Sequence, residues 1–258
     1  MSTNSKKTPN TSPALEFKNS NFSVSVLALS TDNLITIEQE LQKKAKLDKN
    51  FNKHHILPNS MVMCIGGTGS GKTTALMDFL SRKTDAFFDI ILFTGSTVDE
   101  PLYNLMQSKI PDMKVFNNIS ELPSLSEFDN EDKENEKLII FDDFINLTKK
   151  EMVKINEYLT SGRKHGFTVW LMAQSYTAVP KIITRNVMYF LVFKLTDNVT
   201  INCILRNHNI YNVPKEIFKD IYMKSTDKNG NFFMIDMKSN DKEKHLRSNF
   251  INFHKLLV

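Results

Sequence analysis

The stretch Gly66-Gly-Thr-Gly-Ser-Gly71-Lys72-Thr73 lies between the apolar run Met61–Ile65 and a segment of helix-forming residues. It matches the pattern G-x-x-x-x-G-K-[ST] of a phosphate-binding loop, in the strand, loop and helix context that this pattern requires. Four of the eight glycines of the chain fall within its first six positions. A turn that only connected a strand to a helix would not need Lys and Thr in this register. The sequence therefore predicts a nucleotide-binding α/β protein.

The residue types in this loop suit a nucleoside triphosphate. Glycines allow the backbone to curl so that successive N–H groups point at the phosphates, and the positive end of the following helix adds to the attraction. Lys72 is placed to reach the β- and γ-phosphate oxygens, and Thr73 offers a hydroxyl to Mg²⁺. The expected ATP-binding residues are Gly66, Gly67, Thr68, Gly69, Ser70, Gly71, Lys72, Thr73 and Thr74.

A second pattern is an apolar run at Leu138–Phe141 that ends in two carboxylates, Asp142 and Asp143. Acidic side chains at the carboxyl end of a strand face the ligand crevice of an open α/β sheet. We expect Asp142 to hold Mg²⁺, mostly through water, and Asp143 to act as the general base that polarises the attacking water. The alternative is that these paired acids merely end a strand and enter a loop.

Short apolar runs alternate with helical lengths through the middle of the chain. Continuous runs of this length are typical of parallel strands buried on both faces, so the fold class is α/β with a mainly parallel central sheet flanked by helices. The expected strands are Met61–Ile65, Phe88–Thr94, Met113–Phe116, Leu138–Phe141, Phe167–Ala173 and Val187–Lys194. The expected helices are Thr73–Lys83, Asp99–Ser108 and Thr148–Thr160. A capping box from Thr148 to Glu151 marks the start of the third helix.

The order of these runs bears on the kind of nucleotide-binding protein. The run Phe88–Thr94 lies in the sequence between the phosphate-binding loop and the paired carboxylates. At least one strand can therefore be inserted in the sheet between the loop strand and the carboxylate strand. Such an insertion favours motor-type ATPases over nucleoside kinases and GTPases, in which the two strands tend to be adjacent.

Three further polar residues are candidates for catalysis. Gln174 follows the apolar run Phe167–Ala173 and is placed to sense the γ-phosphate or the attacking water, although a glutamine at the edge of the core would look the same. Arg163 and Arg185 are the arginines near these strand ends. A guanidinium delivered from a neighbouring subunit would stabilise transition-state charge. Either arginine could instead be a surface residue or a DNA contact.

The composition is that of an ordinary folded protein. Its 258 residues include 33 Lys and Arg against 29 Asp and Glu, a net charge of +4 that excludes both a strongly acidic protein and a histone-like polycation. Cys64 and Cys203 are the only cysteines, which excludes a disulfide framework or a cysteine-based zinc site and predicts a reducing, intracellular compartment. No apolar run approaches the roughly 20 residues that cross a bilayer, so we expect no membrane span.

The start of the chain differs in composition from the rest. Residues 1–20 are polar and predict a flexible leader. Residues 21–59 predict an accessory N-terminal segment, with a strand from Phe22 and a helix within residues 32–53. Residues 60–258 predict the ATPase domain.

Two polar features are expected to carry no chemistry. His54 and His55 lack a carboxylate or thiol at ligand spacing, so we expect them in a loop or at an edge. Residues 121–137 contain seven acids and two lysines around a proline, which predicts a solvated loop.

Four segments together resemble a known family. They are GGTGSGKTT from Gly66, LIIFDDF from Leu138, SGRKHGFTVWLMAQSYTAVPKIITRNVMYFLVFK from Ser161 and FFMIDMKSNDKEKHLRSNF from Phe232. In these segments the chain is similar to the genome-packaging ATPases of large eukaryotic DNA viruses, virophages and related elements, the A32-like branch of the FtsK–HerA superfamily. The third segment is the most specific, because it joins a GR-K/H-x-G start, an apolar strand ending in A-Q-S, a proline, and R-x-N before another apolar strand. The resemblance covers residues 60–250.

This resemblance implies a P-loop core of the ASCE type, similar to RecA and FtsK–HerA proteins, and a homo-oligomeric ring on double-stranded DNA. It implies ATP-driven movement of a viral genome into a preformed shell, with capsid or packaging-vertex proteins as partners. The implied location is the virus factory of the host cell, in cytoplasm or nucleus, and the virion. ATP and Mg²⁺ contacts fall to Lys72, Thr73 and Asp142, a catalytic role to Asp143 and a sensor role to Gln174. Many members of the superfamily carry Glu in place of Asp143, so the base here is one methylene shorter.

The DNA contacts and the task of the ATPase each have more than one interpretation. Five basic residues would suit modest phosphate contacts along a ring channel, or would simply be the charges of a solvated helix. They are Lys149, Lys150, Lys154, Arg163 and Lys164. A helicase-like or AAA-type remodelling ATPase, and an assembly factor whose hydrolysis only times its release, are the alternatives to a packaging motor.

Overall fold

The computed structural model describes residues 48–83, 87–95, 101–128, 135–144, 147–208, 210 and 213–255. All of them belong to one compact unit that spans Leu47–Val258. The predicted leader, the predicted strand from Phe22 and most of the helix expected within residues 32–53 lie outside the described residues. The division of the chain at residues 20 and 59 stays a prediction.

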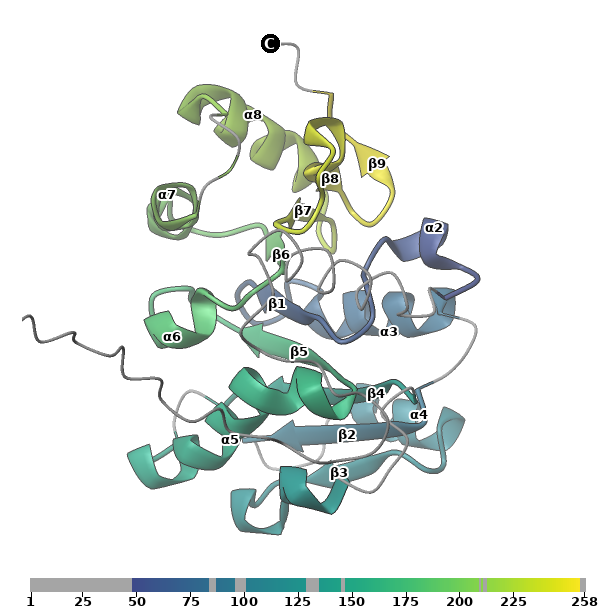
Figure 1. The fold of residues 1–258 in the computed structure, drawn as a ribbon. Coiled ribbons are helices and arrows are strands. Elements are labelled where there is room, and N and C mark those ends of the chain that lie inside the picture. The colour runs from purple at the N-terminus through teal and green to yellow at the C-terminus, as the bar shows by residue number, and fades with distance from the viewer. Residues whose placement is uncertain are drawn as a thin grey trace, which may run out of the picture. The chain divides into compact units, whose positions relative to one another are not determined.

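Nine strands of the described residues form one sheet, in the order β3-β2-β4-β5-β1-β6-β7-β8-β9 (Figure 1). The strands are β1 (Met61–Ile65), β2 (Asp89–Thr94), β3 (Lys114–Phe116), β4 (Lys137–Asp142), β5 (Phe167–Ala173), β6 (Tyr189–Phe193), β7 (Phe232–Asp236), β8 (Leu246–Ser248) and β9 (Asn252–Phe253). Neighbours from β3 to β6 pair in parallel, and β7, β8 and β9 extend the sheet in antiparallel fashion. The predicted α/β class with a mainly parallel sheet is confirmed.

The strand inserted between the loop strand and the carboxylate strand is β5. It pairs with β1 on one side, where Ala173 lies opposite Ile65, and with β4 on the other, where Met172 lies opposite Asp142. An inserted strand is therefore confirmed, but the strand suggested by sequence order is wrong, since β2 lies on the far side of β4. A parallel crossover can step over one or several positions in a sheet, so sequence order alone does not fix neighbours.

Helices cover both faces of the sheet in Figure 1. One face carries α3 (Lys72–Arg82) and α4 (Pro101–Lys109), and the other carries α5 (Lys149–Ser161), α6 (Lys181–Thr184), α7 (Val199–Asn207) and α8 (Lys215–Ser225). The short elements are helix α2 (Phe51–His54) and the 3-10 turns Ile119–Glu121, Leu125–Phe128, Gly162–His165 and Lys242–Lys244. The predicted capping box of α5 is present, because the Glu151 side chain accepts from the Thr148 N–H at 2.8 Å and Thr148 Oγ1 accepts from the Glu151 N–H.

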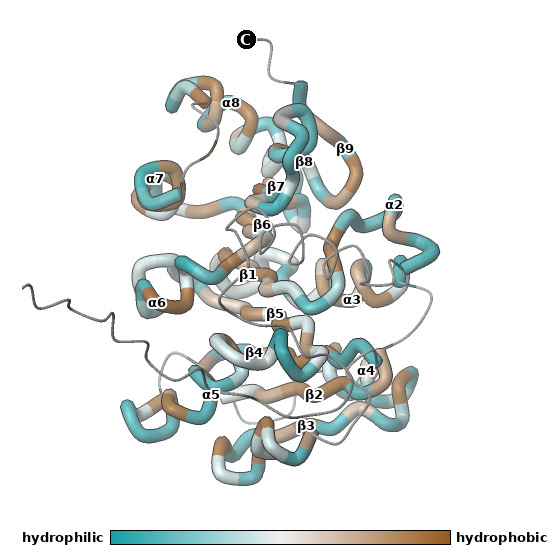
Figure 2. Tube along the Cα trace, viewed as in Figure 1, coloured by the Kyte–Doolittle hydropathy of each residue, from teal (hydrophilic) through white to brown (hydrophobic). Residues whose placement is uncertain are grey.

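The two faces of the sheet bury two separate hydrophobic clusters. Along β1, Met61 and Met63 belong to the cluster under α5 to α8, whereas Val62 and Cys64 belong to the cluster under α3 and α4. Side chains alternate between the faces of a strand, so a strand buried on both sides needs an unbroken apolar run. Figure 2 shows hydrophobic residues concentrated in the central strands, and helices along which hydrophobic and hydrophilic residues are mixed.

Residues 48–59 pack onto the same core. Ile56 is buried in the cluster under α3, and the N–H of Leu57 donates to Tyr189 Oη of β6 at 3.2 Å. His54 is fully buried, and its Nε2 lies 3.0 Å from Asp48 Oδ2. The expectation of a loop or edge position is therefore wrong for His54, because a carboxylate six residues earlier in the chain accompanies it into the core.

The acidic segment at residues 121–137 is only partly a solvated loop. Leu122, Leu125 and Phe128 are buried, and the Phe128 ring meets the Phe167 ring edge-on at a centroid distance of 5.0 Å. Residues 129–134 lie outside the described part of the chain. The high acid content of the segment predicts exposure, whereas its spaced apolar residues are what anchor it to the core.

Candidate nucleotide-binding site

The loop between β1 and α3 adopts backbone angles that require glycine. Gly69 has φ of 72° and Gly71 has φ of 102°, in the left-handed region that side chains disfavour. Gly71 is also pressed against the turn before β7, because a Cβ atom added to it would lie 2.9 Å from the Cα of Gly230. Conformation and close approach therefore both demand glycine at position 71.

Lys72, the first residue of α3, folds back over this loop. Its Nζ donates to the carbonyl oxygens of Gly66 at 2.8 Å and Gly67 at 3.0 Å. The first backbone N–H groups of a helix have no partner within the helix itself, and the N-terminal end of α3 adds a partial positive charge at the same place. An ammonium held beside such N–H groups forms a site for an anion.

Ser70 gives an independent indication of a missing polar partner in the loop. Its Oγ is buried and has no hydrogen-bond partner within the described part of the chain. Buried hydroxyl groups in proteins nearly always have a partner. A phosphate oxygen in the loop would accept a hydrogen bond from this hydroxyl, so the loop fits the phosphates of a nucleotide.

The two predicted carboxylates lie at the carboxyl end of β4. Asp142 is the last residue of the strand, and Asp143 follows with φ of 50°. Aspartate tolerates this left-handed conformation better than most residues, because its short polar side chain bonds locally. The N–H of Gly95, directly after β2, donates to the carbonyl oxygen of Asp142 at 3.0 Å and fixes the end of the strand.

The environment of Asp142 is partly apolar and partly positive. Burial raises the pKa of its carboxyl group above the usual range, and the hydrogen bond from Tyr103 and the charge of Lys72 oppose this increase. Tyr103, in α4, donates from Oη to Asp142 Oδ2 at 2.5 Å. A cation beside the carboxylate would favour its ionised form further. The site is thus suited to a metal ion.

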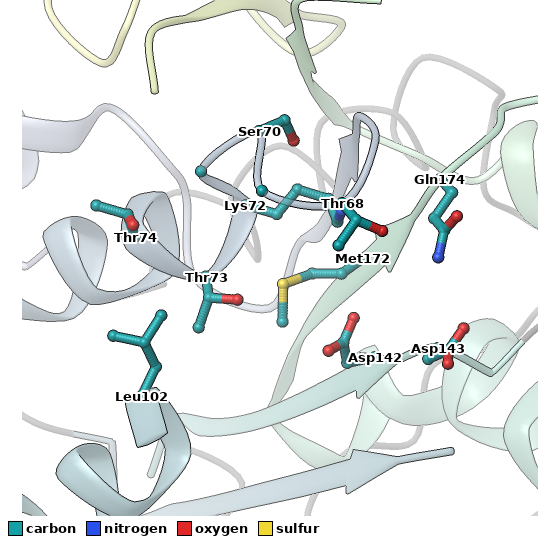
Figure 3. Close-up of a pocket in the computed structure, with 12 residues that line it drawn as sticks. Thr68, Ser70, Lys72, Thr73, Thr74, Leu102, Asp142, Asp143, Met172 and Gln174 are labelled. Atoms are coloured by element: carbon teal, nitrogen blue, oxygen red, sulfur yellow. The ribbon is translucent and has the colours of Figure 1, made fainter. Parts of the chain in front are cut away.

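The phosphate-binding loop, Lys72 and both carboxylates line one cavity of about 450 Å³ at the carboxyl ends of β1, β4 and β5 (Figure 3). Its lining residues are Thr68, Gly69, Ser70, Gly71, Lys72, Thr73, Thr74, Leu102, Asp142, Asp143, Met172 and Gln174. Figure 3 shows the Thr73 hydroxyl turned toward the side of the cavity where Asp142 lies, with Asp143 beyond Asp142 and Gln174 reaching the same end of the cavity from another strand. Gly66 and Gly67 do not line it and instead accept the hydrogen bonds of Lys72.

The two candidate arginines lie elsewhere. Arg163 is in the 3-10 turn directly before β5, and Arg185 follows α6, ahead of β6. Both side chains are exposed. Because β5 and β6 run parallel to β1, these positions are at the amino ends of the strands, opposite the edge that bears the cavity. The chain does not bring either arginine to its own cavity.

Three residues at or beside the site belong to no motif that would have pointed to them in the sequence. Tyr103 lay in a predicted helix without a motif, Met172 lay within a predicted strand, and Leu102 preceded Tyr103. Gly95 had a weak signal, because a glycine directly after an apolar run marks the strand end where α/β proteins bind ligands. Spacing rules identify residues within one motif, whereas these residues reach the site from other elements.

The donor set fits Mg²⁺ bound together with a nucleotide. The described residues contain no group of three or more His, Cys, Asp or Glu side chains that would hold a metal by themselves. Mg²⁺ is commonly held by one or two protein oxygens, several waters and the substrate phosphates. Thr73 and Asp142, which line the cavity together, provide such a pair of oxygens.

No helix within the described ranges is long and apolar enough to cross a membrane.

Comparison with known proteins assigns the chain to a family. The model of the family described as "Poxvirus A32 protein" matches residues 48–252. The chain belongs to the poxvirus A32 family. It is similar to the DNA packaging protein OPG160 of vaccinia virus (strain Copenhagen), with 27% identity over 208 residues that cover 73% of each protein. It is also similar to the DNA packaging protein OPG160 of monkeypox virus, with 26% identity over 223 residues that cover 79% of this chain and 70% of that protein.

Solved structures support the same fold for this member of the A32 family. The genome packaging NTPase B204 from Sulfolobus turreted icosahedral virus 2, in complex with sulfate, aligns with a TM-score of 0.50 and 15% identity over 79% of this chain and 99% of that chain. The same NTPase in complex with AMPPCP aligns with a TM-score of 0.50 and 14% identity over 74% and 96%. The predicted P-loop fold and the predicted family are therefore confirmed.

Proposed function

We propose that this chain is the ATPase motor that moves double-stranded viral DNA into a preformed capsid. The observation that carries the proposal is the convergence of Lys72, Thr73, Asp142, Asp143 and Gln174 on one cavity behind a glycine-rich loop. A loop, a metal-binding pair, a base and an amide at one place are the parts that ATP hydrolysis needs. Membership of the A32 family, whose curated relatives are named DNA packaging proteins, supports DNA as the cargo.

ATP binds through the loop of residues 66–74. Backbone N–H groups and the end of α3 receive the phosphates, and Lys72 neutralises charge on the β- and γ-phosphate oxygens. Thr73 and Asp142 hold Mg²⁺, which supplies Lewis-acid polarisation of the γ-phosphate when bound. The hydrogen bonds of Lys72 to Gly66 and Gly67 place its ammonium in advance, so little ordering is required when ATP arrives.

Hydrolysis uses Asp143 and Gln174. A water between the γ-phosphate and Asp143 transfers a proton to the carboxylate as its oxygen attacks phosphorus, and the bond to the ADP oxygen breaks. The Gln174 amide, at the end of β5, orients this water or reports the presence of the γ-phosphate. Asp143 reaches the water with a side chain one methylene shorter than glutamate, and its left-handed backbone sets the direction of approach.

The remaining catalytic charge comes from a second copy of the chain in a homo-oligomeric ring. None of the described residues that line the cavity is an arginine, and both Arg163 and Arg185 are exposed at the opposite edge of the sheet. Their exposure leaves either residue available to a neighbouring subunit and not to the nucleotide of its own chain. An arginine supplied in this way stabilises transition-state charge.

Double-stranded DNA is held loosely. Lys149, Lys150 and Lys164 are exposed and suit phosphate contacts, whereas Lys154 is half-buried and donates to the Ser120 carbonyl oxygen at 3.4 Å. Contacts of this kind are independent of sequence and weaken with salt, as a sliding motor requires. The other partners are capsid or packaging-vertex proteins, and the chain works in the virus factory of the host cell and in the virion.

The test is the ATPase rate of the full chain with and without double-stranded DNA, at low and moderate salt. We expect double-stranded DNA to raise the rate, salt to remove the stimulation, and Lys72→Ala to abolish turnover under all conditions. An ATPase rate that does not change when DNA is added would favour an assembly factor, and unwinding of a labelled duplex would identify a helicase. Mass in solution with ATP reports whether a ring forms.

A further inference from the structure

Tyr103 connects helix α4 to the metal-binding carboxylate. Its side chain is 2% exposed, and its Oη donates to Asp142 Oδ2 at 2.5 Å. Tyr103 does not line the cavity, but Leu102, the residue before it, does. In the first turn of α4, Leu102 therefore forms part of the cavity wall, and Tyr103 contacts the Asp142 carboxylate from behind that wall.

The hydroxyl group of Tyr103 has a different kind of partner from those of Tyr158 and Tyr222, two other buried tyrosines. Tyr158 donates to the Pro123 carbonyl oxygen at 2.8 Å, and Tyr222 donates to the Phe193 carbonyl oxygen at 3.2 Å. Those contacts satisfy a buried phenol with the backbone, as packing alone requires. Tyr103 instead donates to a side chain of the site, although its ring packs in the apolar cluster under α3 and α4.

Asp142 is held at two points by the segment from β2 to α4. The N–H of Gly95 donates to its backbone carbonyl oxygen at 3.0 Å, and Tyr103 donates to its carboxylate. The first contact fixes where the strand ends, and the second fixes how the carboxylate is turned. One carboxylate oxygen is thus engaged before any ligand arrives.

We propose that Tyr103 is a positioning residue for Mg²⁺: its hydroxyl engages Oδ2 of Asp142 and presents the carboxylate to the metal in a single orientation. This inference rests on the proposed function, because it assumes that Asp142 takes part in holding Mg²⁺ with ATP. Groups that orient a metal-binding side chain typically contribute about 10- to 100-fold to metal affinity or activity. Tyr103 itself does not line the cavity, so it acts through Asp142.

The test measures binding instead of turnover. A fluorescent ATP analogue is titrated onto the full chain in EDTA and at increasing Mg²⁺, for the wild type, Tyr103→Phe and Tyr158→Phe. We expect Tyr103→Phe to shift the Mg²⁺ concentration that gives half of the metal-dependent binding upward by about tenfold or more, with affinity in EDTA unchanged. Tyr158→Phe removes a comparable buried hydroxyl and should leave this midpoint within about twofold of wild type.

A double mutant separates positioning from general loosening. In an Asp142→Asn background, Tyr103→Phe should add no further shift, because the group that it orients has already lost its charge. An unchanged midpoint in Tyr103→Phe, or equal shifts in both tyrosine variants, would overturn the proposal while leaving the nucleotide site intact. A wild-type chain that binds the analogue without any dependence on Mg²⁺ would instead contradict the proposed function itself.

Discussion

A Cβ atom added to Gly95 would lie 2.2 Å from the carbonyl oxygen of Asp143. The end of β2 and the residue after β4 are therefore so close that any residue with a Cβ atom at position 95 would clash with the backbone of Asp143. The same glycine donates its N–H to the Asp142 carbonyl oxygen at 3.0 Å. Gly95 thus sets the position of the backbone that carries both carboxylates of the site.

Gly95→Ala should lower turnover more than nucleotide affinity. The added methyl group must push Asp143 away, and misplacing a catalytic group by about 1 Å can cost on the order of 10²-fold in rate. ATP affinity measured in EDTA should change little, since the loop of residues 66–74 is built on β1 and α3 and does not depend on the carboxylates. Steady-state ATPase rates and binding of a fluorescent ATP analogue measure the two effects.

The control for this glycine is Gly162→Ala. A Cβ atom there would lie 3.4 Å from Phe167 Cβ, an ordinary contact, and Gly162 has right-handed backbone angles at the end of α5. This variant should retain the wild-type rate. Equal losses in the two variants would mean that added bulk, and not the displacement of Asp143, is responsible.

Asp143→Asn and Asp142→Asn should differ in what they impair. Asparagine accepts the left-handed backbone of residue 143, so Asp143→Asn keeps Mg·ATP binding but loses the group that accepts a proton, with turnover lower by about 10²- to 10⁴-fold. Asp142→Asn should weaken Mg²⁺-dependent binding. Binding titrations in Mg²⁺ and in EDTA, beside ATPase rates, make the comparison. If the two variants exchange these properties, the division of roles between the carboxylates is wrong.

The sequence predicted those parts of the site that lie within single motifs. The residues from Thr68 to Thr74, together with Asp142, Asp143 and Gln174, line the cavity, as their positions at strand ends suggested. Each lies at the carboxyl end of a buried strand or on the helix after it, and parallel strands bring such ends to one edge. Local sequence is sufficient for that inference.

Contacts between elements could not be predicted in the same way. Gly95 and Tyr103 meet Asp142 because β2 is the neighbour of β4, and the sequence order of the runs suggested a different position for β2. Without the strand order, no residue of β2 or α4 can be assigned to the carboxylates. The burial of His54 with Asp48 could not be predicted either, because a hydrogen-bonded polar pair in the core leaves no hydrophobic period in the sequence.

His55 should make the protein less stable as the pH falls from about 7 to about 4. Burial, with a further contribution from the charge of Arg247, lowers the pKa of His55 from 6.5 to about 4 in the folded state. Between these values the unfolded chain binds a proton that the folded chain does not, so acid favours unfolding. The stability that depends on neutral His55 is complete above pH 6.5 and is lost as the pH falls through the folded pKa.

His55→Asn tests this dependence. The backbone of His55 has φ of 53°, which asparagine tolerates, so the variant removes the titrating ring without adding strain. It loses the ring contact with Phe253, so its urea midpoint at pH 7.5 should be lower than that of the wild type. The decrease in midpoint from pH 7.5 to pH 5 should nevertheless be smaller in the variant. An equal or steeper decrease would show that other groups dominate acid unfolding.

One of the two variants Arg163→Ala and Arg185→Ala should strongly reduce ATP hydrolysis while leaving ATP affinity largely unchanged. Neither side chain reaches the cavity of its own chain, so its loss does not disturb the loop or the metal pair. An arginine supplied across a subunit interface contributes about 10³- to 10⁵-fold to turnover. An arginine whose removal lowers turnover by only a few-fold is a surface or DNA-binding residue.

Mixing of inactive subunits distinguishes action across an interface from local damage. A Lys72→Ala subunit has an inactive nucleotide site but an intact arginine, whereas an arginine variant has an intact site and no arginine to deliver. In a mixed ring, some interfaces therefore join an intact site to an intact arginine, and the mixture should regain activity that neither variant has alone. Native mass spectrometry establishes that mixed rings form. If they form and activity does not return for either arginine, catalysis does not use an arginine from a neighbour, and the opposite edge of the sheet must serve another contact.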